Sequence, residues 1–250
     1  MKRSLVGYLI ISLKGMAMGA ADVVPGVSGG TIAFISGIYE ELIESLNNIN
    51  LSIFTQLRSK GVKHTWETIN GSFLLALMCG IFISVFSLVR VVEWLLEQHP
   101  ILLWAFFFGL VAASIIYIGK QIKINLWNLE GIKMFLAITI GGIVAYIITT
   151  INPVASSNSN LFLFFAGAFA ICAMILPGIS GAFILVIIGA YGPVLEAISN
   201  RDLKTILIIG AGAIVGLLSF SKLLKWLFKY YNQLTLAVLT GFMIGSLNKI

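Results

Sequence analysis

The sequence contains one short motif twice, and its residue types suit the binding of an anion. Pro25-Gly26-Val27-Ser28-Gly29-Gly30 matches Pro177-Gly178-Ile179-Ser180-Gly181-Ala182. Proline cannot continue a helix, glycine accepts unusual backbone dihedrals, and a serine hydroxyl can cap the helix that follows. Each motif therefore predicts an unwound turn and then a helix N-terminus, where unpaired backbone N–H groups attract an anion. The alternative is that the turns only shape the helices and that each serine bonds to its own backbone.

Two basic residues join the motif residues as candidates for binding a multiply charged anion. Arg90 and Lys222 occupy equivalent places in the two halves of the chain, and an ionisable group within a membrane span is a functional candidate by default. The alternative for each is snorkelling to the lipid headgroups. The full candidate set is Gly26, Ser28, Gly29, Gly30, Thr31, Gly178, Ser180, Gly181, Arg90 and Lys222.

Three further charged residues are candidates for coupling or charge compensation, namely Asp22, Lys14 and Glu40. Asp22 lies three residues before Pro25. It is a candidate to accept a coupling proton, to bind a cation, or to neutralise Lys14 or Arg90. Glu40 is expected to be a solvated carboxylate at the end of the first hairpin. No cofactor is expected apart from coupling to a proton or a sodium ion. No metal site is expected either, because the chain lacks clustered ligands.

The Gly-x-Ser-Gly pattern also occurs in intramembrane serine proteases, so a hydrolase is an alternative. A serine nucleophile needs a base within hydrogen-bond reach, and the two histidines, His64 and His99, fall in expected loops. A pair of Ser28 with Lys14 remains conceivable. Nucleotide-binding signatures are absent from the sequence. We therefore do not expect an enzyme.

An internal duplication extends beyond the motifs. At the same offset of 152 residues, Gly37, Tyr39 and Glu44 match Gly189, Tyr191 and Glu196. At an offset of 132 residues a second set matches: Gly80, Ser87, Arg90, Trp94, Ala105, Gly109 and Ser114 with Gly212, Ser219, Lys222, Trp226, Ala237, Gly241 and Ser246. The difference between the offsets is absorbed by an expected polar loop at 47–71. Two structural repeats explain this pattern better than coincidence.

Composition places these repeats in a membrane. The 250 residues are 59% hydrophobic and 10% charged, whereas about a quarter of the residues in a soluble domain are charged. Helices need about 20 apolar residues to cross the hydrocarbon core, and the alternating pattern of barrel strands is missing. The expected fold is an all-α polytopic membrane protein. The segments almost free of charge are 71–92, 100–119, 134–151, 160–195 and 205–221.

The arms around each motif are too short for comfortable crossing, so we expect re-entrant hairpins at about 5–46 and 161–198. Spans are expected at about 72–96, 101–119, 132–150, 205–228 and 233–250. Three crossings in the first half turn the second half upside down, which predicts inverted repeats, 1–150 and 151–250, within a single membrane domain of 1–250. The span at 132–150 has no counterpart in the second half. The chain is therefore expected to be truncated, or the final span is dispensable.

The placement of charge predicts the orientation. The chain carries a net charge of +6, and with a cytoplasmic N-terminus the inner side receives most of the basic residues. The basic residues on that side are Lys2, Arg3, Arg58, Lys60, Lys63, Lys120, Lys123, Lys225 and Lys229. No basic domain outside the membrane is long enough to bind nucleic acid.

Several stretches resemble a known family. They are residues 19–33 around the first motif, 176–182 around the second, 37–40, and the closing 239–247. The chain is similar over essentially its whole length to the bacterial and archaeal polyprenyl-phosphate (undecaprenyl-phosphate) transporters, formerly a membrane domain family of unknown function. Members of that family usually continue past the last of these stretches. The resemblance implies a bacterial cytoplasmic membrane protein that recycles undecaprenyl phosphate, the lipid carrier of cell-wall precursors.

The expected function is thus a lipid carrier translocase. Two helix N-termini and flanking cations would hold the phosphate, and an apolar lateral opening would take the polyprenyl tail. Alternating access would carry the headgroup across, with Asp22 as the coupling group. The alternative is a small-anion transporter for phosphate or sulfate, or an intramembrane hydrolase. The expected partners are the lipid substrate and membrane lipids, and formation of a homo-oligomer is left open.

Overall fold

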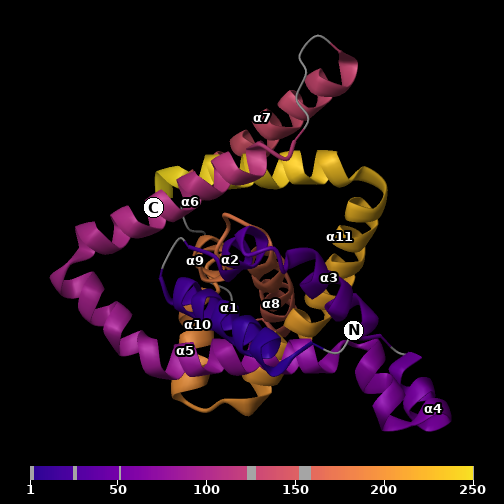
Figure 1. Ribbon diagram of the computed structural model, residues 1–250. Coiled ribbons are helices and arrows are strands. Elements are labelled where there is room, and N and C mark those ends of the chain that lie inside the picture. Colours follow the sequence, from indigo (N-terminus) through magenta and orange to yellow (C-terminus); the bar gives the residue numbers. More distant parts are fainter. Residues whose placement is uncertain (1–2, 25–26, 51, 123–127, 152–158, 250) are drawn as a thin grey trace.

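The computed structural model describes residues 3–24, 27–50, 52–122, 128–151 and 159–249, and these residues form helices without strands (Figure 1). The expectation of an all-α fold is confirmed for this part of the chain. The helices are α1 Leu5–Val23, α2 Gly29–Ile35, α3 Tyr39–Asn48, α4 Ser52–Thr68, α5 Gly71–Gln98, α6 Pro100–Gly119, α7 Leu129–Thr150, α8 Asn160–Ile175, α9 Gly181–Ile187, α10 Tyr191–Ser199 and α11 Leu203–Ser246, followed by the short 3-10 turn η1 Leu247–Lys249.

Several of these helices suit a lipid bilayer. Four stretches are long and apolar enough to cross it, and two bent helix pairs raise the number to as many as six within the described ranges. The four are Leu5–Asp22, Pro100–Gly119, Leu129–Thr150 and Leu203–Lys249. Large apolar side chains also lie exposed on the helix surfaces, such as Phe86 (82%) and Ile101 (81%), which would be costly in water. These are the features of a multi-pass membrane protein.

Helices α1 and α5 pack side by side and run in the same direction. Gly15 of α1 lies against the backbone carbonyl of Leu77, and Gly80 of α5 lies against the carbonyl of Ser12. One turn further along both helices, Gly19 contacts Ile81. Glycine is needed at these positions because a Cβ atom would collide with the facing backbone. Since both helices start at the same end, the chain between them turns back to that end, as a re-entrant hairpin would.

Helices α8 and α11 repeat this contact with matching residues. Gly167 lies against the carbonyl of Ile209, and Gly212 lies against the carbonyl of Phe164. Each residue in these two contacts stands 152 or 132 positions after its counterpart in the α1–α5 pair. α8 and α11 therefore also run in the same direction, and the segment containing α9 and α10 turns back between them.

A break divides α11 into two straight segments, 203–230 and 232–246. Tyr231 leaves the helical region with φ −136° and ψ 41°. The corresponding residue in the first half is His99, which separates α5 from α6 with φ −138° and ψ 49°. The predicted spans at 205–228 and 233–250 meet at this break. The first segment of α11 thus corresponds to α5, and the second segment corresponds to α6.

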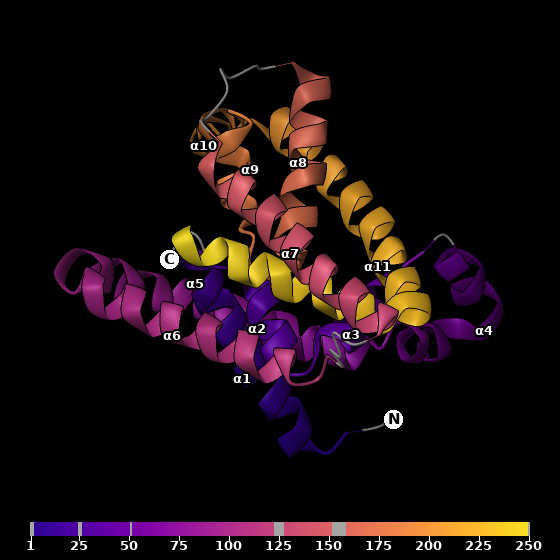
Figure 2. The ribbon, with the colours of Figure 1, turned by 90° about the horizontal axis from the view of Figure 1, so that it is seen from above.

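Helix α7 packs along the second segment of α11 (Figure 2). Gly141 lies against the carbonyl of Val238, and Gly241 lies against the carbonyl of Ile138. The contact advances in the same direction along both helices, since Gly245 then reaches Gly142. Helix α7, which belongs to the first half, therefore packs closely on the second half of the chain.

The expectation of a polar loop at 47–71 is wrong, because the segment contains α4. The side chain of Asn50 accepts a hydrogen bond from the N–H of Ser52 (2.9 Å) and so caps the helix. Gly61, with φ 80° and ψ 173°, then interrupts the helix. Polar composition suggested a loop, but the segment has no proline, and local capping suffices to form a helix at the edge of the fold (Figure 1).

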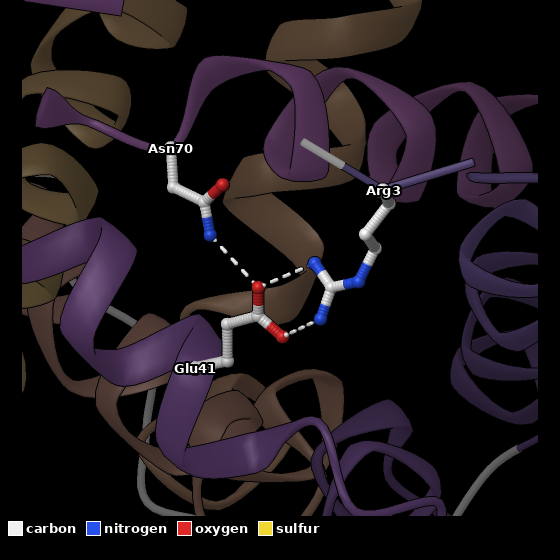
Figure 3. Close-up of polar contacts among 3 residues, drawn as sticks. All are labelled: Arg3, Glu41 and Asn70. Carbon is white, nitrogen blue, oxygen red and sulfur yellow. Dashed lines mark hydrogen bonds and ion pairs between the residues drawn. The ribbon is translucent and has the colours of Figure 1, made fainter. Parts of the chain in front are cut away.

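A charged cluster joins three chain segments at one end of the fold (Figure 3). The Arg3 guanidinium donates to both carboxylate oxygens of Glu41 at 2.6 Å, and the Asn70 side chain donates to the same carboxylate at 2.8 Å. Arg3 precedes α1, Glu41 belongs to α3, and Asn70 precedes α5. The two ends of the first hairpin and the beginning of α5 therefore meet at one side.

The glycine contacts generate a prediction for stability. Gly212→Ala should lower the free energy of unfolding by about 1–3 kcal/mol, because the new Cβ collides with the backbone of Phe164. Gly210→Ala on the same helix is the matched control, since nothing lies within 4 Å of its Cβ position. Thermal unfolding in detergent measures both. Equal melting temperatures for the two variants would contradict the close approach of α8 and α11.

The charged cluster generates a prediction for pH. The hydrogen-bonded Arg3 guanidinium lowers the pKa of the Glu41 carboxyl below its ordinary value. A carboxylate of this kind stabilises the fold above its unfolded pKa, and the contribution disappears as the pH falls through the folded pKa. Glu41→Gln should therefore unfold at a lower temperature than the wild type at pH 7, and the difference should shrink below about pH 4. Glu196→Gln, which changes an exposed carboxylate, is the matched control and should melt like the wild type at pH 7.

Candidate functional site

The two proline-glycine motifs meet in the interior of the fold. The Ser28 hydroxyl lies within hydrogen-bond distance of the carbonyl oxygens of Met174 (3.1 Å) and Leu176 (3.3 Å). In the opposite direction, the N–H of Gly178 donates to Thr31 Oγ1 at 2.9 Å. Ser28 and Thr31 are each only 1% exposed. The tertiary structure therefore brings together candidate residues that lie almost 150 positions apart in the sequence. Gly26 lies outside the described residues.

Two consecutive glycines make this crossing sterically possible. A Cβ atom on Gly29 would lie 2.5 Å from a carboxylate oxygen of Asp22, and a Cβ on Gly30 would lie 2.8 Å from the carbonyl oxygen of Met174. Neither distance is tolerable for a carbon atom. The first glycine thus admits the Asp22 side chain, and the second admits the backbone of the other motif.

The N-terminus of α2 already holds an anionic group of the protein itself. The N–H of Gly29 donates to Asp22 Oδ1 at 2.7 Å, and the N–H of Gly30 donates to the Ser28 hydroxyl at 3.1 Å. Ser28 therefore caps α2 as the sequence indicates. The carboxylate of Asp22 takes the place that an external anion would need at this helix end.

Lys14 lies at the opposite end of α2. Its ammonium group donates to the carbonyl of Ser36 at 2.6 Å, directly after the last residue of the helix. Lys14 and Asp22 stand eight residues apart on α1, about 12 Å in a helix, and α2 has seven residues or about 10 Å. The two helices are antiparallel, so the cation meets the negative end of α2 and the carboxylate meets the positive end. Asp22 and Lys14 thus compensate opposite ends of one helix and do not form an ion pair with each other.

The second motif is built differently. Ser180 occupies the N-cap position of α9 but makes no capping bond with its side chain, and Met174 stands at the position equivalent to Asp22. Gly178 has φ 85°, which favours glycine, and its Cα faces Met243 and Ser246 of α11. Gly181 is buried in close contact with the backbone of α8. Each copy is therefore followed by a seven-residue helix with a serine at its N-cap position, but the two serines differ in their hydrogen bonds.

The remaining charged candidates lie away from this crossing. Arg90 and Lys222 are exposed on α5 and α11, and no hydrogen bond or ion pair connects either one with the motif residues in the described part of the chain. Glu40 is exposed, as expected, and accepts a weak hydrogen bond from the Asn232 side chain at 3.4 Å. The structure therefore assembles the motif residues with Asp22 and leaves the two cations at the helix surface.

An apolar cavity of about 280 Å³ adjoins the crossing of the motifs. It lies in the bend of α11 and reaches Leu176, whose carbonyl oxygen faces the Ser28 hydroxyl. Its lining residues are Leu176, Phe220, Leu224, Leu227, Leu234, Thr235, Val238, Leu239 and Phe242. The apolar lining of this cavity suits a short segment of an alkyl or isoprenoid chain. Sequence reasoning could not locate it, because its walls come from both segments of α11.

A second, polar cavity of about 490 Å³ lies at the turn between α2 and α3. Ser36, Tyr39, Gln121 and Asn232 contribute to its lining. Tyr39 is 2% exposed, and its hydroxyl has no hydrogen-bond partner among the residues that the structure describes. The ring of Tyr39 packs edge-on against aromatic neighbours, which fixes its position. The sequence marked Tyr39 only through its match with Tyr191.

Within the described ranges, no group of three or more histidine, cysteine, aspartate or glutamate residues lies together in a way that could hold a metal ion. The polar chemistry of the motif crossing consists of backbone N–H and carbonyl groups, two hydroxyl groups and one carboxylate. Such a set can exchange hydrogen bonds with an anionic group or accept a proton.

Fold and site together define a multi-pass helical membrane protein with two interrupted helices that meet in its interior. Comparison with known families makes the assignment specific: the chain belongs to the VCA0040-like family, described as undecaprenyl phosphate translocase-like, whose model matches residues 18–250. The resemblance noted in the sequence is thereby confirmed.

Two curated relatives are both named polyprenyl-phosphate transporter. The relative from Vibrio cholerae serotype O1 is 47% identical over 245 residues, which cover 98% of this chain and 78% of the relative. The relative from Staphylococcus aureus is 34% identical over 251 residues, with 94% and 83% covered. No solved structure matches the chain.

The crossing of the motifs generates a prediction. Thr31→Val removes the acceptor of the Gly178 N–H and leaves that buried donor unpaired, which should cost about 1–3 kcal/mol of stability. Thr139→Val, an exposed threonine on α7, is the matched control. Thermal unfolding compares the two. A Thr31 variant as stable as the Thr139 variant would show that this hydrogen bond does not hold the motifs together.

Proposed function

We propose that this protein transports polyprenyl phosphate across the bacterial cytoplasmic membrane and thereby recycles the lipid carrier used in envelope synthesis. The names of both relatives and the description of the family support this substrate. The relatives are named as transporters, which favours transport over hydrolysis. The Ser28 hydroxyl also contacts backbone atoms, and no base on the described residues bonds to it.

The observation that carries the proposal is the contact between an apolar cavity and a polar crossing. A polyprenyl phosphate is an amphiphile: its tail gains by staying in an apolar environment, while its phosphate is costly to bury without hydrogen bonds. Leu176 belongs to the wall of the cavity, and its carbonyl faces Ser28 at the crossing. The segment of the tail next to the headgroup is thus held in the bend of α11, and the phosphate reaches the motifs.

The phosphate competes with Asp22 for the same backbone donors. In the present conformation the N–H of Gly29 is bonded to Asp22, and the N–H of Gly178 is bonded to Thr31. Two adjacent anions in a medium of low dielectric constant repel each other strongly. Asp22 must therefore take up a proton or move away when the phosphate arrives. Transport is coupled to protons in this way, with Ser28 and Thr31 as further phosphate ligands.

Alternating access follows from the relationship between the two halves. The matching glycine contacts, the breaks at His99 and Tyr231, and the positive φ angles of Gly37 and Gly189 support two inverted repeats. The motif copies differ, because Ser28 is hydrogen-bonded across the crossing and Ser180 makes no capping bond. This asymmetry is expected of one state in an alternating-access cycle. In the other state the hydrogen-bonding roles of Ser28 and Ser180 are exchanged.

The orientation follows from basic residues. Arg3 lies at the same end as the beginning of α5, and the preceding helix α4 carries exposed Arg58, Lys60 and Lys63. Positive residues accumulate on the cytoplasmic side of membrane proteins. The N-terminus and α4 therefore face the cytoplasm. The proposed inverted repeat puts the exposed Arg90 and Lys222 at opposite membrane surfaces, where they attract phosphate headgroups.

The test is leaflet-resolved transport of polyprenyl phosphate in proteoliposomes. Folded protein should accelerate the transfer of the lipid over empty vesicles. Asp22→Asn should slow it by about tenfold, which corresponds to about 1.4 kcal/mol, and should flatten its pH dependence. Asp202→Asn is the matched control, since Asp202 is an exposed N-cap and asparagine caps equally well.

No acceleration by folded protein would overturn the proposal. Transport of inorganic phosphate in place of the lipid would identify a small-anion transporter. Unchanged transport by the Asp22 variant would exclude the competition between its carboxylate and the phosphate, while leaving the substrate assignment intact.

A further inference from the structure

The apolar cavity in the bend of α11 has a buried floor and a more open mouth. Leu224 and Leu239 are each 2% exposed and form the floor. Phe220, Leu227 and Leu234 are only half-buried and line the mouth. The volume between them is about 280 Å³. The burial of these side chains therefore indicates a small recess that opens at the surface of α11.

The surface beside this mouth is apolar and exposed. Leu223 lies one helical turn from both Phe220 and Leu227, does not line the cavity and is 47% exposed. Trp226 on the same stretch is 48% exposed. Helix α11 is long and apolar enough to span a bilayer, so exposed apolar side chains on it face lipid. A chain that leaves the cavity thus enters the hydrocarbon of the membrane directly.

The cavity wall offers a ligand packing contacts and no hydrogen bond donor. Among the described residues that line it, Thr235 is the only one with a polar side chain. The Thr235 hydroxyl already donates to the carbonyl of Tyr231 on its own helix at 2.9 Å. The wall therefore selects a ligand by the apolar volume that the ligand fills.

The volume of the cavity limits how much of a tail it can hold. An apolar cavity of about 150 Å³ accommodates one benzene ring, so a cavity of about 280 Å³ holds roughly twice as many carbon atoms, or about two isoprene units. The headgroup end of this segment is fixed, because Leu176 belongs to the wall and its carbonyl faces Ser28. Isoprene units further along the chain lie outside the cavity.

The isoprene units outside the cavity contribute nothing to selection. They lie in hydrocarbon before and after the lipid binds, so no apolar surface is removed from water. The units inside exchange contacts with lipid for contacts with the protein, and a part of the cavity that stays unfilled loses the contacts of its wall. Only the units next to the phosphate are therefore read.

We propose that the protein recognises isoprenoid monophosphates through the phosphate and about the first two isoprene units, and that it accepts any greater chain length. The inference rests on the proposed function and defines which part of the substrate that site reads. The substrate class is thus the linear isoprenoid monophosphates with at least two isoprene units. The long-chain carrier lipid is one member of this class.

The test is displacement of a radiolabelled long-chain polyprenyl phosphate from the wild-type protein in phosphatidylcholine nanodiscs. The competitors are dimethylallyl, geranyl, farnesyl and long-chain polyprenyl phosphate, which have one, two, three and many isoprene units. Each concentration is measured in the nanodisc lipid, so unequal partitioning into the bilayer does not enter the comparison. We expect equal displacement by the last three and about tenfold weaker displacement by dimethylallyl phosphate, which leaves half of the cavity unfilled.

Leu227→Trp tests the cavity itself. The larger side chain fills the mouth and should weaken the binding of both the labelled lipid and geranyl phosphate by about tenfold. Leu223→Trp is the matched control, because it makes the same substitution one turn away at an exposed side chain outside the cavity. It should bind both lipids like the wild type. Equal melting temperatures of the two variants separate loss of binding from loss of folding.

Three outcomes would overturn the inference. Affinity that keeps rising from geranyl to long-chain phosphate would mean that the protein contacts more of the chain. Equal affinity for dimethylallyl and geranyl phosphate would mean that the phosphate alone is recognised. Wild-type binding by folded Leu227→Trp would put the tail outside this cavity. The comparison of chain lengths uses wild-type protein, so it decides the question even if Leu227→Trp does not fold.

A failure of the proposed function has a different signature. No binding of the labelled long-chain lipid by folded protein would overturn the substrate assignment and this inference with it. In each of the three outcomes above, the long-chain lipid still binds and is still transported, and only the selection by the first isoprene units is lost.

Discussion

The fold depends on satisfying backbone polar groups where helices end inside an apolar bundle. Hydrocarbon offers no hydrogen bonds, so each unpaired N–H or carbonyl group at such an end is costly. For α2 the protein meets this cost with two charged side chains from one neighbouring helix: Asp22 binds the first N–H, and Lys14 binds the carbonyl after the last residue. Because both charges are bonded to opposite ends of the same helix dipole, neither is left isolated. These two bonds hold α2 antiparallel to α1.

Close approach of helix backbones is the second constraint, and it determines how the halves are assembled. Gly15 and Gly80 allow α1 and α5 to lie almost in backbone contact, and Gly167 and Gly212 do the same for α8 and α11. Helices that pack in this way cannot be separated by a side chain, so the hairpins between them must fold back within the space that remains. Within that space the two motifs bond to each other, and they also contact α1 through Gly29 and α11 through Gly178.

Differences between the two halves carry the functional argument. A carboxylate occupies the N-terminus of α2, whereas the equivalent position near α9 holds Met174. A protein that moves a phosphate between two faces needs a site that releases its ligand as well as one that binds it. In the proposed mechanism, the internal anion Asp22 competes with the substrate and so provides this release, while the neutral copy at Met174 provides a different affinity. The asymmetry is thus part of the proposed mechanism and is compatible with a duplicated backbone.

Hydrophobic run length, proline-glycine turns and matched glycines are local signals, so the helical membrane fold, the duplication and the family could be predicted without a structure. The role of Ser28 as a helix cap could be predicted in the same way. The contacts of Ser28 with Met174 and Leu176, the bonds of Asp22 and Lys14 to opposite ends of α2, and the exposure of Arg90 emerge only in the folded chain. These outcomes depend on which distant segments touch, and one sequence contains no direct record of contacts. Helix α4 was missed for a related reason: its polar composition resembles that of a loop, and a single cap at Asn50 shifts the balance toward helix.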